Sequence, residues 1–445
     1  MNIPTNILAL IFVLSVLIVV HEFGHYAVAK YFKFPVEVFS LGFGKRLFGW
    51  KRKETDYRVS LIPLGGYVKV VGLGPDESDV VTPEHPEPAV TGARWQRLLI
   101  LVAGPVMNLA LAVVLTAGAF MVGMEVLKYQ EEPPAVKHVE AGSPAERAGV
   151  KVDDVVVRIG GKPVSTWREV EMDLGLAPRE NIPVDVQRGD ETVSVTLRPE
   201  PQTKYDIGYT GLNPFLPPVI GSLVSGYPGE KAGLKAGDRI LSVGGREVKG
   251  YYEVVRKVRE AAAGFDGPEG PKPIAFVVER GGETMTFEVT PRKEASSWRI
   301  GFSPKYETVL KQLPLGAAFS AAWTELGRQT TTTFATVGRL FRGTGSMRQL
   351  SGPIDIAKFS GEAIRTGPAA LLVLMGMLSL QLGILNLLPI PLLDGGQIFV
   401  TLLESAARRD FPLKIKERLL QAGFVFLVLV MVTVLYFDVL KNVSF

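Results

Sequence analysis

The sequence predicts a polytopic α-helical membrane protein with four transmembrane helices, a membrane-associated β-hairpin region and a folded α+β part outside the membrane. Hydrophobic residues make up 47% of the 445 residues, although the chain also contains long hydrophilic stretches. Four apolar segments each approach the ~20 residues that a bilayer core requires. An internal repeat lies between the second and the third of these segments. The chain therefore combines membrane spans with folded soluble parts.

Composition excludes several kinds of site. There are no cysteines, so neither a disulfide framework nor a thiolate metal site can form. The net charge is +4 and basic residues are interspersed with acidic ones, so we expect no nucleic-acid partner. Of the four histidines, His85 and His138 lie in hydrophilic stretches. A third ligand beside the other two is therefore expected to be a carboxylate.

The spans are expected at residues 5–28, 98–121, 369–393 and 419–440. The first begins without charged residues and has no small-residue cleavage site, so we interpret it as a transmembrane helix rather than a signal peptide. Lysine and arginine are frequent in the connections between spans one and two and between spans three and four. The positive-inside rule then places both connections in the cytoplasm, and both termini and the stretch between spans two and three outside.

The first span carries a candidate catalytic motif, His21-Glu22-Phe23-Gly24-His25, near its inner end. Residues four apart lie on one face of a helix, so the imidazoles of His21 and His25 project together. Two neutral imidazoles at this spacing suit Zn²⁺, and Glu22 can take a proton from a metal-activated water. The alternative is a chance match on an anchoring helix. Ionisable groups are costly inside hydrocarbon, which favours the catalytic interpretation.

Asp394 is the candidate third ligand. It is the only ionisable residue from position 369 to position 403, and the predicted topology places it at the depth of His21 and His25. The alternative is that Asp394 only caps a helix after a break, because Asp-Gly is a turn signal. Pro389 and Pro391 before it indicate unwound backbone, which a membrane tolerates where protein or water satisfies it.

The connection from residue 31 to residue 96 is expected to be β-rich. Residues 57–71 are β-branched and aromatic with a Pro-Leu-Gly65-Gly66 break, a pattern typical of a hairpin. Aromatic and basic residues precede it, as is common where protein meets lipid. This region is either a small anchoring sheet or a re-entrant strand whose edge pairs with an unwinding substrate. Residues 72–92 are expected to form a loop.

The stretch between spans two and three repeats itself. Ala148-Gly-Val-Lys-Val-Asp-Asp154 returns 84 positions later as Ala232-Gly-Leu-Lys-Ala-Gly-Asp238, and paired glycines keep the same offset. Each copy closes on a similar tripeptide, Ile207-Gly208-Tyr209 and Ile300-Gly301-Phe302. A repeat of this length predicts tandem domains.

Together these residues resemble the site-2 protease family of intramembrane zinc metalloproteases, which pairs HExxH on one span with Leu-Asp-Gly on another. The closer match is the group of bacterial proteases that regulate sigma-E. Three motifs of this chain carry the match to that group: the run from Asn386 to Gly396, the second-span motif Ala103-Gly-Pro-Val-Met-Asn108, and Gly42-Phe43-Gly44. The resemblance implies a multi-pass inner-membrane protease, with its termini on the periplasmic side, that cuts single-span proteins within the lipid bilayer. The family's examples of substrates are an anti-sigma factor and remnant signal peptides.

The repeat resembles bacterial PDZ domains, in which a glycine-containing loop and a strand edge bind a peptide C-terminus. Candidate peptide-binding residues are Ile207, Gly208, Tyr209, Ile300, Gly301 and Phe302. The alternative is that these residues only form strand-ending turns and that the groove is occluded. The family resemblance gives Asn386 a role in holding substrate, and Pro389, Pro391, Gly65 and Gly66 are further substrate-binding candidates.

The expected segments are 1–30 (first transmembrane helix with HExxH), 31–96 (cytoplasmic or re-entrant β-rich connection), 97–124 (second transmembrane helix), 125–215 (first PDZ domain), 216–308 (second PDZ domain), 309–368 (interfacial helices), 369–403 (third transmembrane helix with the Asp-Gly motif) and 419–441 (fourth transmembrane helix). The predicted function is a zinc endopeptidase whose PDZ domains act as a size-excluding filter. The alternatives are a membrane-tethered PDZ adaptor or chaperone with a non-catalytic metal site, and a transporter with a structural zinc. The near absence of other intramembrane charges and of inverted repeats argues against the transporter.

Overall fold

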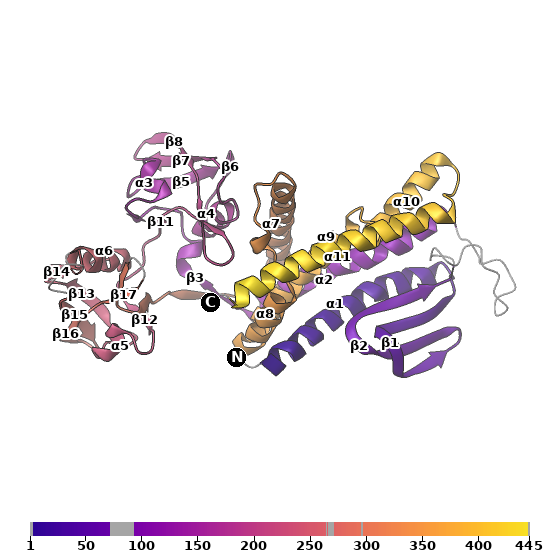
Figure 1. Cartoon of the computed structure of the whole chain (residues 1–445), viewed down its shortest axis with the longest axis horizontal. Coiled ribbons are helices and arrows are strands. Elements are labelled where there is room, and N and C mark those ends of the chain that lie inside the picture. Colours follow the sequence, from indigo (N-terminus) through magenta and orange to yellow (C-terminus); the bar gives the residue numbers. More distant parts are fainter. Residues whose placement is uncertain (1–2, 72–92, 264, 266–270, 295–296, 444–445) are drawn as a thin grey trace. The chain divides into compact units, whose positions relative to one another are not determined.

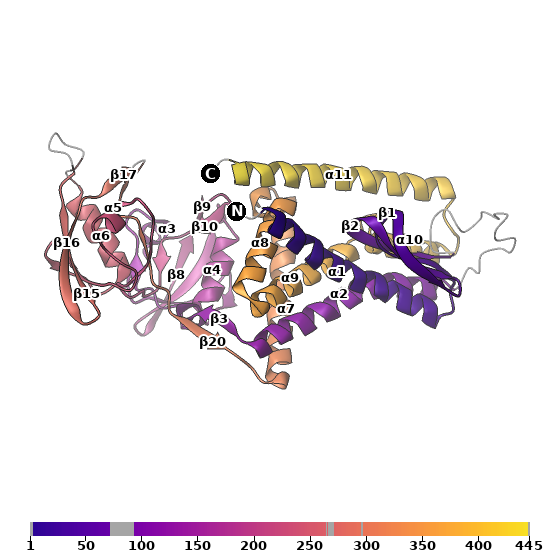
Figure 2. The same ribbon diagram turned by 90° about the horizontal axis from the view of Figure 1, so that it is seen from below.

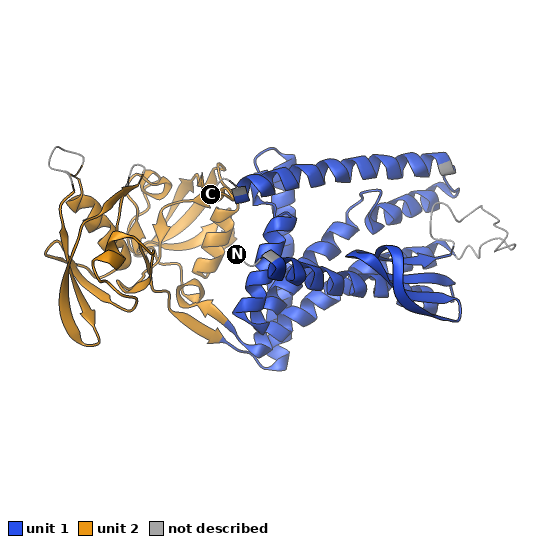
Figure 3. Ribbon diagram, turned by 60° about the horizontal axis from the view of Figure 1, so that its bottom comes forward, with its two compact units in different colours: residues 1–124, 311–445 blue, residues 125–310 orange. Residues whose placement is uncertain are grey.

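The computed structural model describes residues 3–71, 93–263, 265, 271–294 and 297–443. The predicted loop at 72–92, with His85, lies outside these residues. The chain divides into two compact units, residues 1–124 with 311–445 and residues 125–310 (Figure 3). Unit 1 holds the apolar helices and unit 2 holds the repeat.

Four helices of unit 1 are long and apolar enough to cross a membrane. They are α1 (Ile3–Tyr31), α2 (Arg94–Val122), α9 (Pro368–Leu387) and α11 (Leu413–Val443) (Figure 1). The expectation of a helical membrane protein with four spanning helices is confirmed to this extent. Both chain ends lie at the same end of unit 1 (Figure 1), as an even number of spans requires.

Helix α2 is the centre of the bundle, and glycines bring its neighbours close. A Cβ on Gly24 of α1 would lie 2.4 Å from the carbonyl oxygen of Ala103. A Cβ on Gly383 of α9 would lie 3.1 Å from the carbonyl oxygen of Pro105. Without a strong hydrophobic force between helices in lipid, such close backbone packing is a main source of helix association. The two contacts therefore fix α1 and α9 on α2 around Ala103 and Pro105.

The segment expected as one span from 369 to 403 is divided in the structure. Helix α9 ends at Leu387, and six residues separate it from α10 (Asp394–Ala407). The prolines at 389 and 391 account for the break because proline cannot continue a helix ladder. A Cβ on Gly395 or Gly396 would lie 2.1–2.5 Å from backbone atoms of residues 387–391. The two glycines thus let the start of α10 pack against the broken segment, and this packing positions Asp394.

The β-rich connection is a long hairpin of β1 (Val36–Arg52) and β2 (Thr55–Val70), packed on α1. Its turn lies at Lys53–Glu54, whereas the Pro-Leu-Gly-Gly break lies inside β2. Residues 38–41 pair with 56–59 on one side and with 66–69 on the other. The two strands therefore bend into a small sheet in which 66–70 is one edge, and no further strand pairs with that edge among the described residues.

Between unit 2 and α9 the chain forms α7 (Leu315–Phe341), the 3₁₀ turn η2 (Met347–Gln349) and α8 (Pro353–Thr366). Helix α7 packs on α2 through Ala318, Ala322 and Leu326, which are buried. Helix α8 packs on α1, where a Cβ on Gly361 would overlap Asn6. The interfacial position expected for residues 309–368 stays a prediction.

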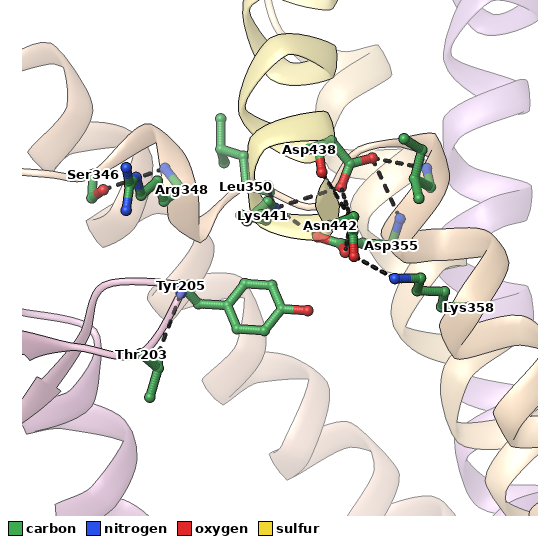
Figure 4. A network of polar contacts seen from close by, with 11 residues as sticks. Thr203, Tyr205, Ser346, Arg348, Leu350, Asp355, Lys358, Asp438, Lys441 and Asn442 are labelled. Carbon is green, nitrogen blue, oxygen red and sulfur yellow. Dashed lines mark hydrogen bonds and ion pairs between the residues drawn. The ribbon is translucent and has the colours of Figure 1, made fainter. Parts of the chain in front are cut away.

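The C-terminal end of helix α11 lies beside α8 (Figure 2), and a buried polar cluster attaches it there (Figure 4). The Asp438 carboxylate accepts hydrogen bonds from the backbone N–H groups of Ile354 (2.8 Å) and Asp355 (3.4 Å), so it caps the start of α8. The Lys441 ammonium donates to Asp355 (2.6 Å) and to the carbonyl of Leu350 (2.9 Å). Both aspartates are fully buried and Lys441 is 3% exposed. Elsewhere on α11, among the side chains that the structure describes, only Gly423 is buried.

Unit 2 contains two copies of one sheet. Strands β5 (Val155–Ile159), β6 (Lys162–Pro163), β7 (Ile182–Arg188) and β8 (Glu191–Leu197) pair in the order β6-β5-β7-β8. The second copy pairs β13 (Arg239–Val243), β14 (Arg246–Glu247), β15 (Ile274–Arg280) and β16 (Glu283–Val289) in the matching order β14-β13-β15-β16. Each copy has its own buried apolar cluster.

The remaining elements of unit 2 are β3 (Met124–Leu127), η1 (Lys128–Glu131), β4 (His138–Val139), α3 (Pro144–Arg147), α4 (Trp167–Gly175), β9 (Glu200–Gln202), β10 (Ile207–Tyr209), β11 (Leu212–Asn213), β12 (Ile220–Leu223), α5 (Pro228–Lys231), α6 (Tyr251–Ala261), β17 (Arg292–Glu294), β18 (Ser297–Arg299), β19 (Phe302–Pro304) and β20 (Thr308–Lys311). Strands β3 and β20 pair with each other, so the chain enters and leaves this unit through one two-stranded stem.

The repeated aspartates hold the same position in both copies. Asp154 accepts from the backbone N–H of Lys151 (2.8 Å) and from two nitrogens of Arg188 (2.8 and 2.7 Å). Asp238 accepts from its equivalents Lys235 (2.8 Å) and Arg280 (2.7 Å). Burial would raise the pKa of each carboxyl, but the arginine and the backbone donor hold that pKa below its usual value. The sequence repeat therefore corresponds to a structural repeat, in which each copy contains the same turn with a buried aspartate bound by an arginine.

Replacing Lys441 by methionine should destabilise unit 1, because two buried aspartates then lose the ammonium group that lies between them. Removal of one partner of a buried ion pair typically costs about 3–5 kcal/mol. Thermal and denaturant unfolding of the full chain in detergent micelles would measure the change. Lys414→Met is the matched control, since Lys414 is an exposed lysine of the same helix. Equal stability of the two variants would contradict the structural role of the cluster.

Candidate metal centre

Three ligand atoms from two helices converge in unit 1. Nε2 of His21 and Nε2 of His25, on α1, lie 3.2 Å apart. Oδ2 of Asp394, the first residue of α10, lies 3.1 Å from the former and 3.5 Å from the latter. The structure therefore brings together the two histidines and the carboxylate that the sequence pattern selected.

The spacing of these atoms fits a tetrahedral ion. Zinc binds imidazole nitrogen and carboxylate oxygen at about 2.0–2.2 Å, so neighbouring ligands of a tetrahedral zinc lie about 3.3–3.5 Å apart. The measured separations of 3.1–3.5 Å approach that edge length. Three protein ligands would leave one position for water, as in catalytic zinc sites.

The chemistry of the donor set also fits a cation. The two histidines are 7% and 9% exposed, and the Oδ2 atom of Asp394 is buried without a hydrogen-bond donor among the described residues. Buried polar atoms without partners are rare in native proteins, and each needs an explanation. A bound cation satisfies all three atoms at once. Within the described residues, this is the only group of three or more such side chains with metal-binding spacing.

Helix α2 shapes the back of this centre. A Cβ on Gly104 would lie 2.3 Å from Nε2 of His25 and 2.9 Å from Cε1 of His21, so any larger residue would displace the imidazoles. The Nδ1 atom of His25 lies 2.7 Å from the carbonyl oxygen of Ile100. The Nδ1 atom of His21 lies 3.0 Å from the side-chain amide of Asn108. Gly104 and Asn108 belong to the second-span motif, to which the sequence alone gave no role.

Glu22 lies beside the three ligand atoms without joining them. It borders the same cavity of about 260 Å³, whose lining also includes Tyr67, Val68 and Gln397. Val68 of β2 lines the cavity beside Glu22. A carboxylate next to a metal position can accept a proton and return it.

The edge strand of the hairpin borders this cavity. Residues 67–70 line it together with His21, Glu22 and His25. A Cβ on Gly66 would lie 3.5 Å from Cγ of Glu22, and a Cβ on Gly65 would overlap the ring of Phe43. This edge of the sheet therefore lies at the candidate metal centre.

The remaining substrate-binding candidates lie outside the cavity lining. Asn386 is in the last turn of α9, and Pro389 and Pro391 are in the segment that leads to Asp394. Pro391 contacts α11, since a Cβ on Gly423 would lie 3.0 Å from its Cβ. The structure explains the prolines through the helix break, and the substrate role of all three residues stays a prediction.

The two candidate peptide grooves of unit 2 differ. In the second copy, Ile300, Gly301 and Phe302 line a cavity of about 360 Å³ together with apolar residues of α6 and Trp298. In the first copy, β10 lies directly against the end of α4, where a Cβ on Gly208 would be 2.4 Å from the carbonyl oxygen of Leu174. His138 lies on β4 and stacks on Tyr252. Among the described residues, His138 belongs to no group with metal-binding spacing.

Comparisons with known proteins agree with this geometry. The model of peptidase family M50 matches residues 9–430. The "Regulator of sigma-E protease RseP" of Salmonella typhimurium is 30% identical over 464 residues, which cover 98% of this chain and 99% of that protein. The "Regulator of sigma E protease" of Haemophilus influenzae is 29% identical over 455 residues, covering 97% and 98%.

The name of a third relative specifies zinc. A Neisseria meningitidis protein named "Putative zinc metalloprotease" is 31% identical over 456 residues, covering 98% of this chain and 99% of that protein. The family match spans both the HExxH helix and the Asp-Gly segment. The chain therefore belongs to peptidase family M50, the site-2 protease family, and is a zinc metalloprotease.

Proposed function

We propose that His21, His25 and Asp394 hold the zinc ion and that Glu22 is the general base of peptide hydrolysis within the membrane. The observation that carries this proposal is the convergence of three buried acceptor atoms at 3.1–3.5 Å. When bound, the metal supplies Lewis-acid activation of water and of the scissile carbonyl. The three ligand residues all lie in or next to membrane-spanning helices.

The Glu22 carboxylate has the position that proton transfer requires. It borders the cavity that His21, His25 and Asp394 also line. It takes a proton from the attacking water and delivers that proton to the leaving amine.

The substrate is proposed to be a transmembrane segment of a single-span membrane protein. A peptide bond inside a helix is protected by the helix's own hydrogen bonds, so the segment must unwind before it is cut. No further strand pairs with the 66–70 edge among the described residues, and residues 67–70 line the cavity beside Glu22. Strand addition at this edge would hold the extended segment against the metal centre.

The proposed location is the inner membrane of a bacterium, with both termini and unit 2 on the periplasmic side. Basic residues at the His21 end of the bundle support this orientation through the positive-inside rule. Relatives named as regulators of sigma-E protease support an anti-sigma factor as one substrate. Remnant signal peptides are a second proposed class, because they too are single apolar helices.

Unit 2 is proposed to be a tandem of PDZ domains that excludes substrates with a bulky outer domain. The repeated sheet order supports the tandem. Of the two grooves, the second is the better candidate for peptide binding, because its lining surrounds a cavity. Gly301 has a φ of +87°, so glycine is favoured at the loop that would face a peptide carboxylate.

Replacing Glu22 by glutamine should leave the metal bound but lower cleavage by about 10²–10⁴-fold, because a neutral amide cannot accept the proton. Zinc content and cleavage of a single-span test substrate should be measured on one purified preparation, with and without a chelator. Glu54→Gln is the control, since Glu54 lies at the hairpin turn. Turnover close to that of the control would remove Glu22 from its role.

Replacing Asp394 by alanine should weaken zinc binding by more than about a hundredfold, since even groups that merely support a ligand contribute 10- to 100-fold. Chelator competition followed by metal analysis would measure the affinity. His138→Ala, which removes a histidine remote from the described metal-binding group, should retain full zinc occupancy. Full occupancy in Asp394→Ala would place the third ligand elsewhere.

Deleting residues 136–304 tests the filter. The β3–β20 stem remains in this variant, so a short linker can join its strands. Cleavage of a trimmed substrate should stay within about tenfold of the intact protein, because unit 2 supplies no group to the chemistry. Substrate that still carries its outer domain should become cleavable. Loss of activity on trimmed substrate, with the membrane part folded and zinc-loaded, would show that unit 2 delivers substrate instead.

A further inference from the structure

The ligation proposed above fixes which nitrogen of each imidazole carries a proton. Both Nε2 atoms point toward Oδ2 of Asp394, so each would offer its Nε2 lone pair to the metal. A neutral imidazole has one protonated nitrogen, so Nδ1 of each ring must carry the hydrogen. Each Nδ1 therefore needs an acceptor within hydrogen-bonding distance.

His25 has such an acceptor in the backbone of α2. Its Nδ1 lies 2.7 Å from the carbonyl oxygen of Ile100, and a carbonyl oxygen can only accept. Pro105, four residues after Leu101, interrupts the hydrogen-bond ladder of α2 next to this carbonyl. The carbonyl oxygen of Ile100 thus determines the tautomer of His25, because this oxygen can accept a hydrogen bond but cannot donate one.

His21 has Asn108 in the equivalent place. The amide nitrogen of Asn108 lies 3.0 Å from Nδ1 of His21, while its amide oxygen is buried and has no donor among the described residues. A half-turn of the amide exchanges its oxygen and nitrogen. The oxygen then accepts the Nδ1 hydrogen of His21, which is the arrangement that ligation through Nε2 requires.

We infer that Asn108 is a positioning residue that orients His21 and fixes its metal-binding tautomer through its side-chain oxygen. This inference rests on the proposed ligand set. The surroundings of Asn108 hold it in place: the residue is fully buried, and its backbone carbonyl accepts a hydrogen bond from Ser379 of α9 (2.8 Å). Gly104, one turn earlier on α2, leaves the space into which the two imidazoles project. The second-span motif therefore combines a space-making glycine with a hydrogen-bonding asparagine.

The test compares two replacements of Asn108 in the full-length protein. Asn108→Leu removes the acceptor at similar volume, and should weaken zinc binding by about 10- to 100-fold, the usual cost of losing a residue that supports a metal ligand. Asn108→Asp keeps an acceptor, and should stay within about threefold of the wild-type affinity. Asn108→Ala is measured in parallel in case leucine is not accommodated. The readouts are chelator competition and the visible absorption of cobalt-substituted protein.

Thr116→Val is the matched control, because Thr116 is a buried polar residue of the same helix that lies two turns away. It should change neither the zinc affinity nor the cobalt spectrum. Wild-type affinity in both Asn108→Leu and Asn108→Ala would overturn the inference, and so would an Asn108→Asp protein as weak as Asn108→Leu. His21→Ala distinguishes failure of the proposed ligand set from failure of the role of Asn108. If it retains zinc, the ligand set itself is wrong; if it loses zinc while the Asn108 variants do not, only the role of Asn108 fails.

Discussion

The constraint on which the structure of unit 1 depends is the burial of three lone-pair donors in an apolar bundle. Two imidazole nitrogens and one carboxylate oxygen lie within 3.5 Å of one another, and the carboxylate oxygen has no hydrogen-bond donor among the described residues. Leaving such groups unpartnered in a low-dielectric interior is costly. A bound cation would offset this cost. The helix break before Asp394 and the absence of a side chain at Gly104 of α2 are the packing conditions that bring the three atoms together.

Helix α2 supports the centre without contributing a ligand. Ile100, Gly104 and Asn108 lie on one face at intervals of four residues, and each contacts one or both histidines. The same helix packs against α1, α7 and α9. Its position therefore determines both the helix arrangement and the orientation of the imidazoles. If His21, His25 and Asp394 hold zinc as proposed, a site built on rigid helices in this way would keep its geometry while the proposed substrate segment unwinds beside it.

The sequence singled out the residues that converge in unit 1 because ionisable residues are rare in apolar spans. His21, Glu22, His25 and Asp394 each stand out from hydrophobic neighbours, and helix periodicity places the two histidines on one face. Tertiary details were not predictable in the same way. Pro-Leu-Gly-Gly suggested a hairpin turn, but strand pairing moves the turn to Lys53–Glu54 because β1 extends through the aromatic and basic residues.

The polar cluster on α11 shows a second limit of sequence reasoning. Asp438 and Lys441 are charged residues near the end of a span, where a snorkelling lysine is the usual expectation. Their burial depends on α8, which is more than 80 residues away in the chain. Asn108 is a similar case, because its partner His21 lies on another helix. Such pairings need the packed structure, since no local pattern encodes the partner.

The central claim is that zinc is bound by two imidazoles and a carboxylate. X-ray absorption spectroscopy at the zinc edge of the full-length, metal-loaded protein tests it most directly. We expect a four-coordinate site of nitrogen and oxygen ligands at about 2.0–2.2 Å, with the scattering signature of two imidazoles. In Asp394→Ala that two-imidazole signature should persist in whatever metal remains bound. A spectrum with no imidazole, or with three or more, would contradict the account.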